Sequence, residues 1–143
     1  MAAQNVYLVP IDFSSGSDHA LDYALKLRRE KKAKLVALHV VPTEILSTPI
    51  DARFDLSSLL ERDARAEFEK LAKRKRLAPA DCTFRVARGT NFGEVIARQA
   101  KKLGAAMIVM GSHGRTGFQR LLLGSVAEKT LRYADCPVLI IKK

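Results

Sequence analysis

The stretch AAMIVMGSHGRTG, residues 105–117, followed by Gly124 and Ser125, decides the fold prediction for this chain. Its apolar run at 105–110 predicts a buried strand, and a helical pattern at 126–133 follows the glycines. Glycine lets a backbone approach an anion closely. The N-terminus of the following helix offers free N–H groups and the positive end of its dipole. The stretch therefore predicts a nucleotide-binding α/β protein.

Strand-like and helix-like segments alternate along the whole chain. Short apolar runs predict strands at 6–11, 35–41, 83–87, 105–110 and 137–141. Apolar residues at helical spacing predict helices after Ser14, over 55–76, after the capping residue Asn91 and over 126–133. The segment 42–54 contains two prolines and no period, which predicts a loop. This order predicts a doubly wound parallel sheet with helices on both faces.

Two segments far apart in sequence converge on one edge of such a sheet. Ligands of doubly wound sheets bind beyond the carboxyl ends of the strands, where the strand order reverses. The glycine stretch leaves the fourth strand at that edge, and Pro10, Ile11 and Asp12 end the first strand there. A chance cluster of glycines would not require this convergence.

The composition sets limits on the class of protein and on its partners. A chain of 143 residues predicts one domain, 1–143, with a real core. The net charge of +10, from 25 basic and 15 acidic residues, favours anionic partners. The densest basic run, residues 70–76, has two interpretations: it complements the dipole at a helix C-terminus, or it contacts nucleic acid. It contains no aromatic residue to stack on bases, which favours the first interpretation.

Cysteine usage and hydropathy predict a cytoplasmic location. Cys82 and Cys136 have no metal-ligand spacing, and two cysteines fit a reducing compartment. The sequence contains no stretch of about 18 apolar residues, so we expect no membrane span. The first five residues carry no basic side chain, so we expect no secretory signal.

The spacing of the glycines separates this stretch from other phosphate sites. It reads G-x-x-G, nine residues, then G-S, through Gly111, Gly114, Gly124 and Ser125. A P-loop would need Gly-Lys-Ser/Thr, and a dinucleotide site would carry its glycines after the first strand. With this spacing the whole chain resembles the universal stress protein family, in its ATP-binding branch. Further matches are Pro10 and Asp12, His39 with Val40, Gly89, and the segment 136–139.

The resemblance implies a fold and a role for each matching residue. The fold would be adenine nucleotide alpha hydrolase-like, with strand order 3-2-1-4-5. Asp12 and the backbone of Val40 would face adenine, and Met110 and Gly111 would line the ribose. The phosphates would be held by the remaining matches, Gly114, Gly124, Ser125 and Val126. The complete predicted nucleotide site is Pro10, Ile11, Asp12, Val40, Met110, Gly111, His113, Gly114, Arg115, Gly124, Ser125 and Val126.

Several of these residues also have a purely structural interpretation. Asp12 could cap the following helix, and His39 could be a strand-end histidine whose ring is satisfied within the fold. His113 could act as a general base near a γ-phosphate or only shape the loop, and Arg115 could bind phosphate or remain solvated. No convincing base is present, so the loop favours holding ATP over cleaving it.

Three functions follow from these residues. The first is an ATP-binding stress-response regulator that carries Mg²⁺ with the nucleotide, and the resemblance implies a homodimer paired through the last strand, Val138–Ile141. The second is a slow ATPase or phosphotransferase. The third is a nucleic-acid-binding protein driven by the positive charge, whose affinity would fall steeply with salt.

Overall fold

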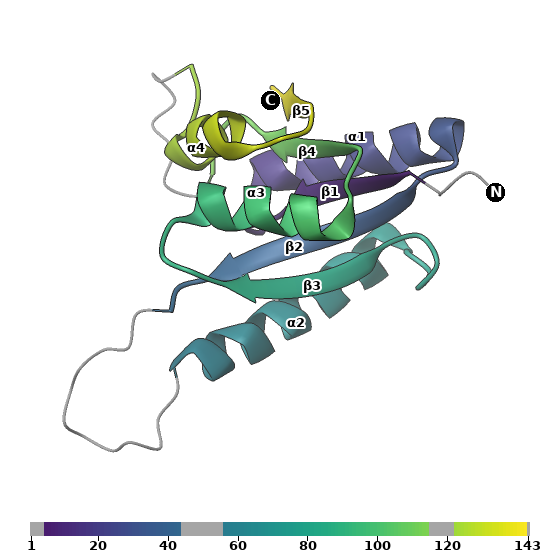
Figure 1. Ribbon diagram of the computed structural model, residues 1–143. Coiled ribbons are helices and arrows are strands. Elements are labelled where there is room, and N and C mark those ends of the chain that lie inside the picture. Colours follow the sequence, from purple (N-terminus) through teal and green to yellow (C-terminus); the bar gives the residue numbers. More distant parts are fainter. Residues whose placement is uncertain (1–4, 44–55, 115–121, 143) are drawn as a thin grey trace.

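Five parallel strands form the centre of the molecule, and the computed structural model describes residues 5–43, 56–114 and 122–142 (Figure 1). The strands are β1 Val6–Pro10, β2 Lys34–Val41, β3 Thr83–Arg88, β4 Met107–Gly111 and β5 Val138–Ile141. They lie in the order β3-β2-β1-β4-β5, which confirms the expected order 3-2-1-4-5. The order reverses between β1 and β4, so a crevice is expected at the carboxyl ends of these two strands.

Helices cover both faces of the sheet, as the alternating pattern predicts. The helices α1, Ser15–Lys31, and α2, Leu56–Lys75, share one core cluster with the sheet. The helices α3, Phe92–Leu103, and α4, Ser125–Tyr133, lie on the opposite face, with a second cluster. Figure 1 shows both layers, with α3 and α4 on one side of the sheet and α1 and α2 on the other.

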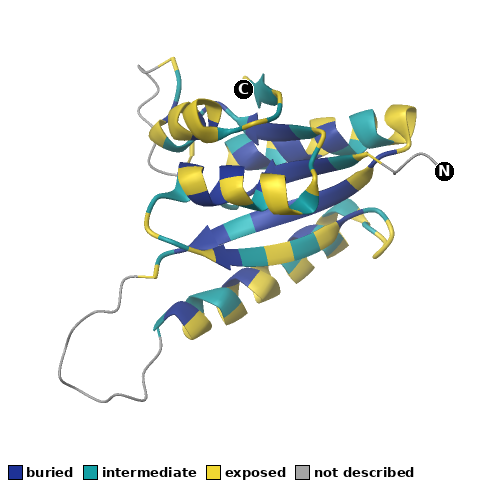
Figure 2. Ribbon diagram, in the orientation of Figure 1, coloured by how far each residue is buried: buried dark blue, intermediate teal, exposed yellow. Residues whose placement is uncertain are grey.

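Successive side chains of the central strands point to opposite faces of the sheet and so contribute to both clusters. Tyr7 and Val9 of β1 belong to the cluster under α1 and α2, whereas Leu8 belongs to the cluster under α3 and α4. Leu8 and Val9 are both 0% exposed, so β1 is buried on both faces. Two-sided burial is typical of parallel sheets and explains the continuous apolar runs (Figure 2).

Capping residues start and end the helices where the sequence predicts them. Ser14 caps α1, because its side chain accepts a hydrogen bond from the Ser17 N–H. Asn91 caps α3 in the same way through the N–H of Glu94, at 3.2 Å. Gly104 ends α3 in the left-handed conformation, with φ of 61°. Each residue satisfies backbone groups that the helix itself leaves unpaired.

The fourth strand begins two residues later than its apolar run suggests. The N–H of Ala105 donates to the carbonyl of Ala100 and closes the last turn of α3. The N–H of Ala106 bonds to Val6, and the strand begins only at Met107. Local hydropathy does not separate these alanines from the strand, because the hydrogen bonds of the helix end decide the boundary. The expected loop at 42–54 and the expected helix start at residue 55 lie outside the described residues, except for Pro42 and Thr43.

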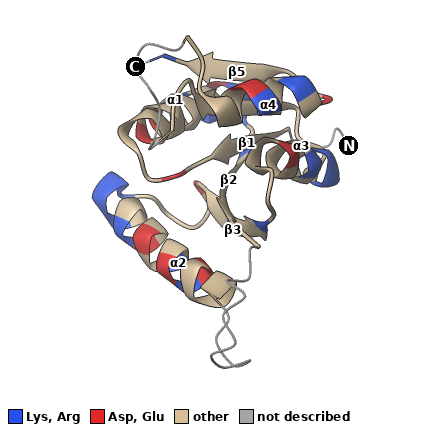
Figure 3. Ribbon diagram, turned by 90° about the vertical axis from the view of Figure 1, so that its left-hand side faces the viewer, with Lys and Arg blue, Asp and Glu red and all other residues tan. Residues whose placement is uncertain are grey.

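The basic run at the end of α2 pairs with α1. Lys75 lies 3.0 Å from a carboxylate oxygen of Asp18 and 2.6 Å from one of Asp22. Arg74 lies 3.3 Å from Asp18. In Figure 3 the blue of Lys and Arg residues gathers at this end of the α2 ribbon. Part of the run therefore neutralises acidic side chains of the same molecule, in addition to complementing the helix dipole.

None of the helices in the described ranges combines the length and the apolar character that crossing a membrane requires.

Candidate functional site at the carboxyl edge of β1 and β4

We call the segment from Gly111 to Gly124 the glycine loop, and the end of β1 places Asp12 beside Gly114 of this loop. The N–H of Ile11 still donates to Leu38 of β2, and Asp12 is the first residue beyond this ladder. One carboxylate oxygen of Asp12 accepts the Ser14 N–H at 3.0 Å. A Cβ added to Gly114 would lie 2.8 Å from the other oxygen, Oδ2. Two residues 102 positions apart, both predicted as site residues, therefore meet in the fold.

Asp12 also has the structural role that its position allows. Its own N–H donates to the hydroxyl of Ser17 at 3.3 Å, and its carboxylate holds the Ser14 N–H. Ser14 rather than Asp12 is the N-cap of α1. Asp12 thus orders the turn before the helix, while its Oδ2 faces the glycine loop.

The end of β4 packs backbone against backbone on the start of α1. A Cβ at Gly111 would lie 2.9 Å from both the carbonyl carbon and the oxygen of Gly16. A Cβ at Gly16 would lie 2.8 Å from the carbonyl oxygen of His113. Both positions exclude a side chain because another backbone occupies the space. Sequence reasoning missed Gly16, although a glycine in the first turn of a helix is a signal that could have found it.

The start of α4 is open to an anion. Gly124 is its N-cap, and no side chain of the described residues caps the helix there. The first helical bond runs from the Glu128 N–H to Gly124, so the earlier N–H groups of the first turn have no partner within the helix. Ser125 is exposed and Val126 is half-buried. Free N–H groups at the positive end of a helix dipole form an anion site.

Gly124 is held close to the glycine loop. Its N–H donates to the carbonyl of Ser112 at 2.6 Å, and an added Cβ would lie 3.0 Å from that same oxygen. The start of α4 is therefore fixed against the strand end that carries Gly111. The structure accounts for these glycines first by the close approach of protein atoms, whereas the sequence interpretation explained them by the approach of phosphate.

The two histidines near the site form contacts within the fold. Nδ1 of His39 lies 2.8 Å from the carbonyl oxygen of Ile11, which only accepts, so this nitrogen carries the proton and donates. His39 thus ties the end of β2 to the end of β1, which confirms its structural interpretation. Nδ1 of His113 lies 3.0 Å from the hydroxyl of the buried Ser112.

The remaining predicted residues reach the edge mainly through their backbone. Pro10 is the last residue of β1 and is buried. Val40 and Met110 are 8% and 5% exposed, and their side chains belong to the core cluster under α3 and α4. Arg115 lies outside the described residues. In the part of the chain that the structure describes, no three His, Cys, Asp or Glu side chains come together in a way that could hold a metal ion.

Comparisons with known proteins agree with this architecture. The family model described as the universal stress protein family matches residues 6–142. Universal stress protein MJ0531 of Methanocaldococcus jannaschii is 32% identical over 98% of this chain and 85% of its own length. The solved structure of universal stress protein UspA from Lactobacillus plantarum is 27% identical, with a TM-score of 0.75 over 99% of both chains. A universal stress protein from Archaeoglobus fulgidus in complex with dAMP, 22% identical, shares the fold with a TM-score of 0.67, over 99% of this chain and 100% of its own.

Proposed function

Since the chain belongs to the universal stress protein family, we propose that it binds ATP at the carboxyl edge of β1 and β4 and acts as a nucleotide-responsive regulator of a stress response in the cytoplasm. One observation carries the proposal: the Asp12 carboxylate packs on Gly114 in the glycine loop, which precedes α4, a helix whose start no side chain of the described residues caps. This arrangement offers an acceptor for a nucleoside and donors for its phosphates along one edge of the sheet.

The proposal divides the site into an adenine side and a phosphate side. Pro10, Ile11 and Asp12 with the backbone of Val40 form the adenine side. Met110 and Gly111 lie between the two sides and contact the ribose through their backbone. The phosphates are held by the glycine loop and the helix start, that is by His113, Gly114, Arg115, Gly124, Ser125 and Val126. Mg²⁺ binds with the phosphates, since this ion usually takes few protein ligands and keeps several waters.

Tight binding of a nucleotide requires contacts on both sides of the site. A helix N-terminus contributes roughly 0.3–2 kcal/mol to an adjacent charge. Micromolar affinity corresponds to about 8 kcal/mol. The start of α4 therefore cannot supply the affinity alone, and the base and ribose contacts at the ends of β1, β2 and β4 must supply much of the rest. The dAMP complex of the Archaeoglobus fulgidus relative supports an adenine nucleotide as the first ligand to test.

Calorimetric titration of the purified protein with Mg-ATP, ADP, AMP and GTP tests this proposal. We expect saturable binding of adenine nucleotides and weaker binding of GTP. Replacement of Ser125 by glutamate should weaken ATP binding at least about tenfold, because a fixed negative charge then faces the phosphates. Thr90→Glu is the matched control, since Thr90 is exposed and follows β3 on the same edge of the sheet. Absence of binding at millimolar ATP, or equal affinity of the Ser125→Glu variant and the wild type, would contradict the proposal.

We further propose that the protein holds ATP without rapid turnover. His113 is the candidate base of the described loop, and its Nδ1 already lies at hydrogen-bond distance from Ser112. Chromatographic quantification of ADP after incubation with Mg-ATP measures turnover directly. Multiple turnovers per minute that disappear in Asp12→Ala would instead establish the slow ATPase as the function.

The same proposal includes a homodimer paired through β5. This strand lies at the edge of the sheet, and its four apolar residues are only half-buried. Leu131 and Tyr133 of the neighbouring α4 are 44% and 46% exposed. An apolar edge strand invites pairing with another chain. Light scattering coupled to size-exclusion chromatography should show a dimer that Leu131→Glu weakens, whereas Leu59→Glu on the distant α2 should leave it intact. A wild-type monomer at high concentration would refute this part.

A further inference from the structure

Phe13 adopts a backbone conformation that a bulky residue rarely takes. Its φ is +64°, in the left-handed region. Two other non-glycine residues of the described ranges share this region, Lys32 and Arg76, with φ of 52° and 54°. Lys32 is the C-cap of α1, and Arg76 follows the last residue of α2. The left-handed conformation is common at helix ends. Phe13 has no such reason, since it lies between the end of β1 and the start of α1.

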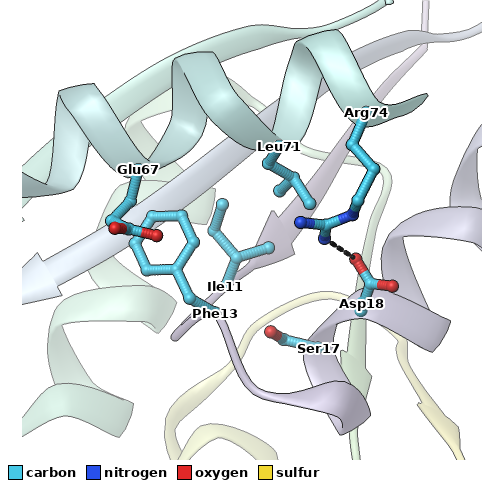
Figure 4. A pocket seen from close by; sticks show the side chains of 7 residues that line it. All are labelled: Ile11, Phe13, Ser17, Asp18, Glu67, Leu71 and Arg74. Atoms are coloured by element: carbon cyan, nitrogen blue, oxygen red, sulfur yellow. Dashed lines mark hydrogen bonds and ion pairs between the residues drawn. The ribbon is translucent and has the colours of Figure 1, made fainter. Parts of the chain in front are cut away.

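The side chain of Phe13 is anchored on the face of the sheet that α1 and α2 cover. Its ring packs against the core cluster there and lies 5.0 Å from the ring of His39. It lines a small cavity of about 60 Å³ together with Ile11 and with Leu71 of α2. Figure 4 shows the ring beneath α2, beside Ile11 and Glu67, on the side opposite the Arg74–Asp18 ion pair. The described residues of the glycine loop, 111–114 and 122–124, do not line this cavity.

The neighbours of Phe13 contact the candidate nucleotide site. Asp12 directs one oxygen to the Ser14 N–H and lies with the other against Gly114. Ser14 is the N-cap of α1. The left-handed turn at Phe13 thus lets the ring enter the core while the residue before it faces the loop and the residue after it starts the helix.

We propose that Phe13 is a positioning residue: its anchored ring holds the left-handed turn that aims the Asp12 carboxylate at the glycine loop. This inference rests on the proposed nucleotide site. An L-residue resists the left-handed region because its Cβ approaches the following carbonyl oxygen. Such a conformation persists only where the surroundings over-determine it. The contact of the ring with His39 and its packing against the core cluster that includes Ile11 and Leu71 supply that constraint.

The matched variants Phe13→Ala and Phe13→Gly separate backbone positioning from packing. Both remove the ring, but glycine adopts a positive φ freely, whereas alanine does not. We expect Phe13→Ala to weaken ATP binding about tenfold and Phe13→Gly by less than about threefold, because alanine resists the left-handed conformation that glycine adopts freely. Equal losses in the two variants would show that the ring acts only through packing and would overturn the inference.

Amide hydrogen exchange gives a readout that needs no nucleotide. The Ser14 N–H, which bonds to Asp12, should exchange faster in Phe13→Ala than in Phe13→Gly. The N–H of Glu94, bonded to Asn91 at the start of α3, is the internal control and should not change. If the wild type binds no ATP, the proposed function fails, and the Ser14 amide still decides the role of Phe13. Unchanged exchange at Ser14 in Phe13→Ala would overturn the inference.

Discussion

Replacing Gly111 with alanine should separate the start of α1 from the end of β4. Gly111 is the last residue of β4 and pairs with Ile141 in the sheet, so its conformation suits any residue. Glycine is required there because of space. An added Cβ would lie 2.9 Å from two backbone atoms of Gly16, which cannot rotate away as a flexible side chain would.

The cost follows from this overlap. Overpacking of a well-packed site costs about 1–3 kcal/mol. For a domain of this size, each kcal/mol lowers the melting temperature by about 3 °C. We therefore expect Gly111→Ala to melt about 3 to 9 °C below the wild type. Typical stabilities of 5–15 kcal/mol leave the variant folded at room temperature, so its ligand binding remains measurable.

Gly104→Ala is the matched control for this substitution. Gly104 has φ of 61°, and an added Cβ would meet nothing within 4 Å. Alanine should cost about 1 kcal/mol there through backbone strain alone. Both variants therefore lose stability, but only Gly111→Ala should weaken ATP binding, because only Gly111 touches the start of α1 beside the proposed site.

Calorimetric melting and ATP titration of both variants decide the matter. A melting temperature of Gly111→Ala within about 1 °C of the wild type would refute the close packing of β4 on Gly16. A large loss of stability with unchanged ATP affinity would support the close packing of Gly111 on Gly16 and would contradict the place of Gly111 in the nucleotide site.

Three further predictions concern other parts of the fold. Hydrogen bonds from Arg88 and Arg65 lower the pKa of Glu61 below its usual 4.5. Glu61→Gln should therefore lower the free energy of unfolding by about 0.5 kcal/mol at pH 7. In urea denaturation this difference from the wild type should disappear as the pH falls through the lowered pKa. Lys75→Met should cost about 1 kcal/mol, because it removes the ammonium that lies against Asp18 and Asp22, although Asp18 keeps its ion pair with Arg74. A change below about 0.3 kcal/mol in the same assay would contradict this. Burial raises the pKa of the Cys82 thiol to about 11, so in Cys136→Ser its reaction with Ellman's reagent at pH 8 should be about a hundredfold slower than that of a free thiol and should accelerate with pH; rapid reaction in the native state would show that Cys82 is accessible.

Local signals were sufficient for the elements and for several residues of the site. The apolar runs of β1 and β2, interrupted only by His39, predict strands buried on both faces. Asn91 and Gly104 mark the ends of α3, since capping depends on one or two residues. The spacing from Gly111 to Gly124 identifies the loop, and the fold places Gly114 of this loop beside Asp12.

Boundaries set by hydrogen bonds between elements were not accessible in this way. Ala105 and Ala106 continue an apolar run, but their N–H groups bond to the end of α3 and to Val6. Hydropathy carries no information on these partners.

The sequence by itself determined the alternation of strands and helices, the position of the glycine loop and the family, because these depend on periodicity and on spacing along the chain. Only the tertiary structure decided that Gly16 packs on Gly111, that His39 donates to Ile11, and that Phe13 takes a left-handed turn with its ring under α2. Each of these contacts joins elements that are distant in sequence. Their physical origin is the close packing of backbones and side chains at one edge of the sheet, where the space left by one element determines which residue the other can carry.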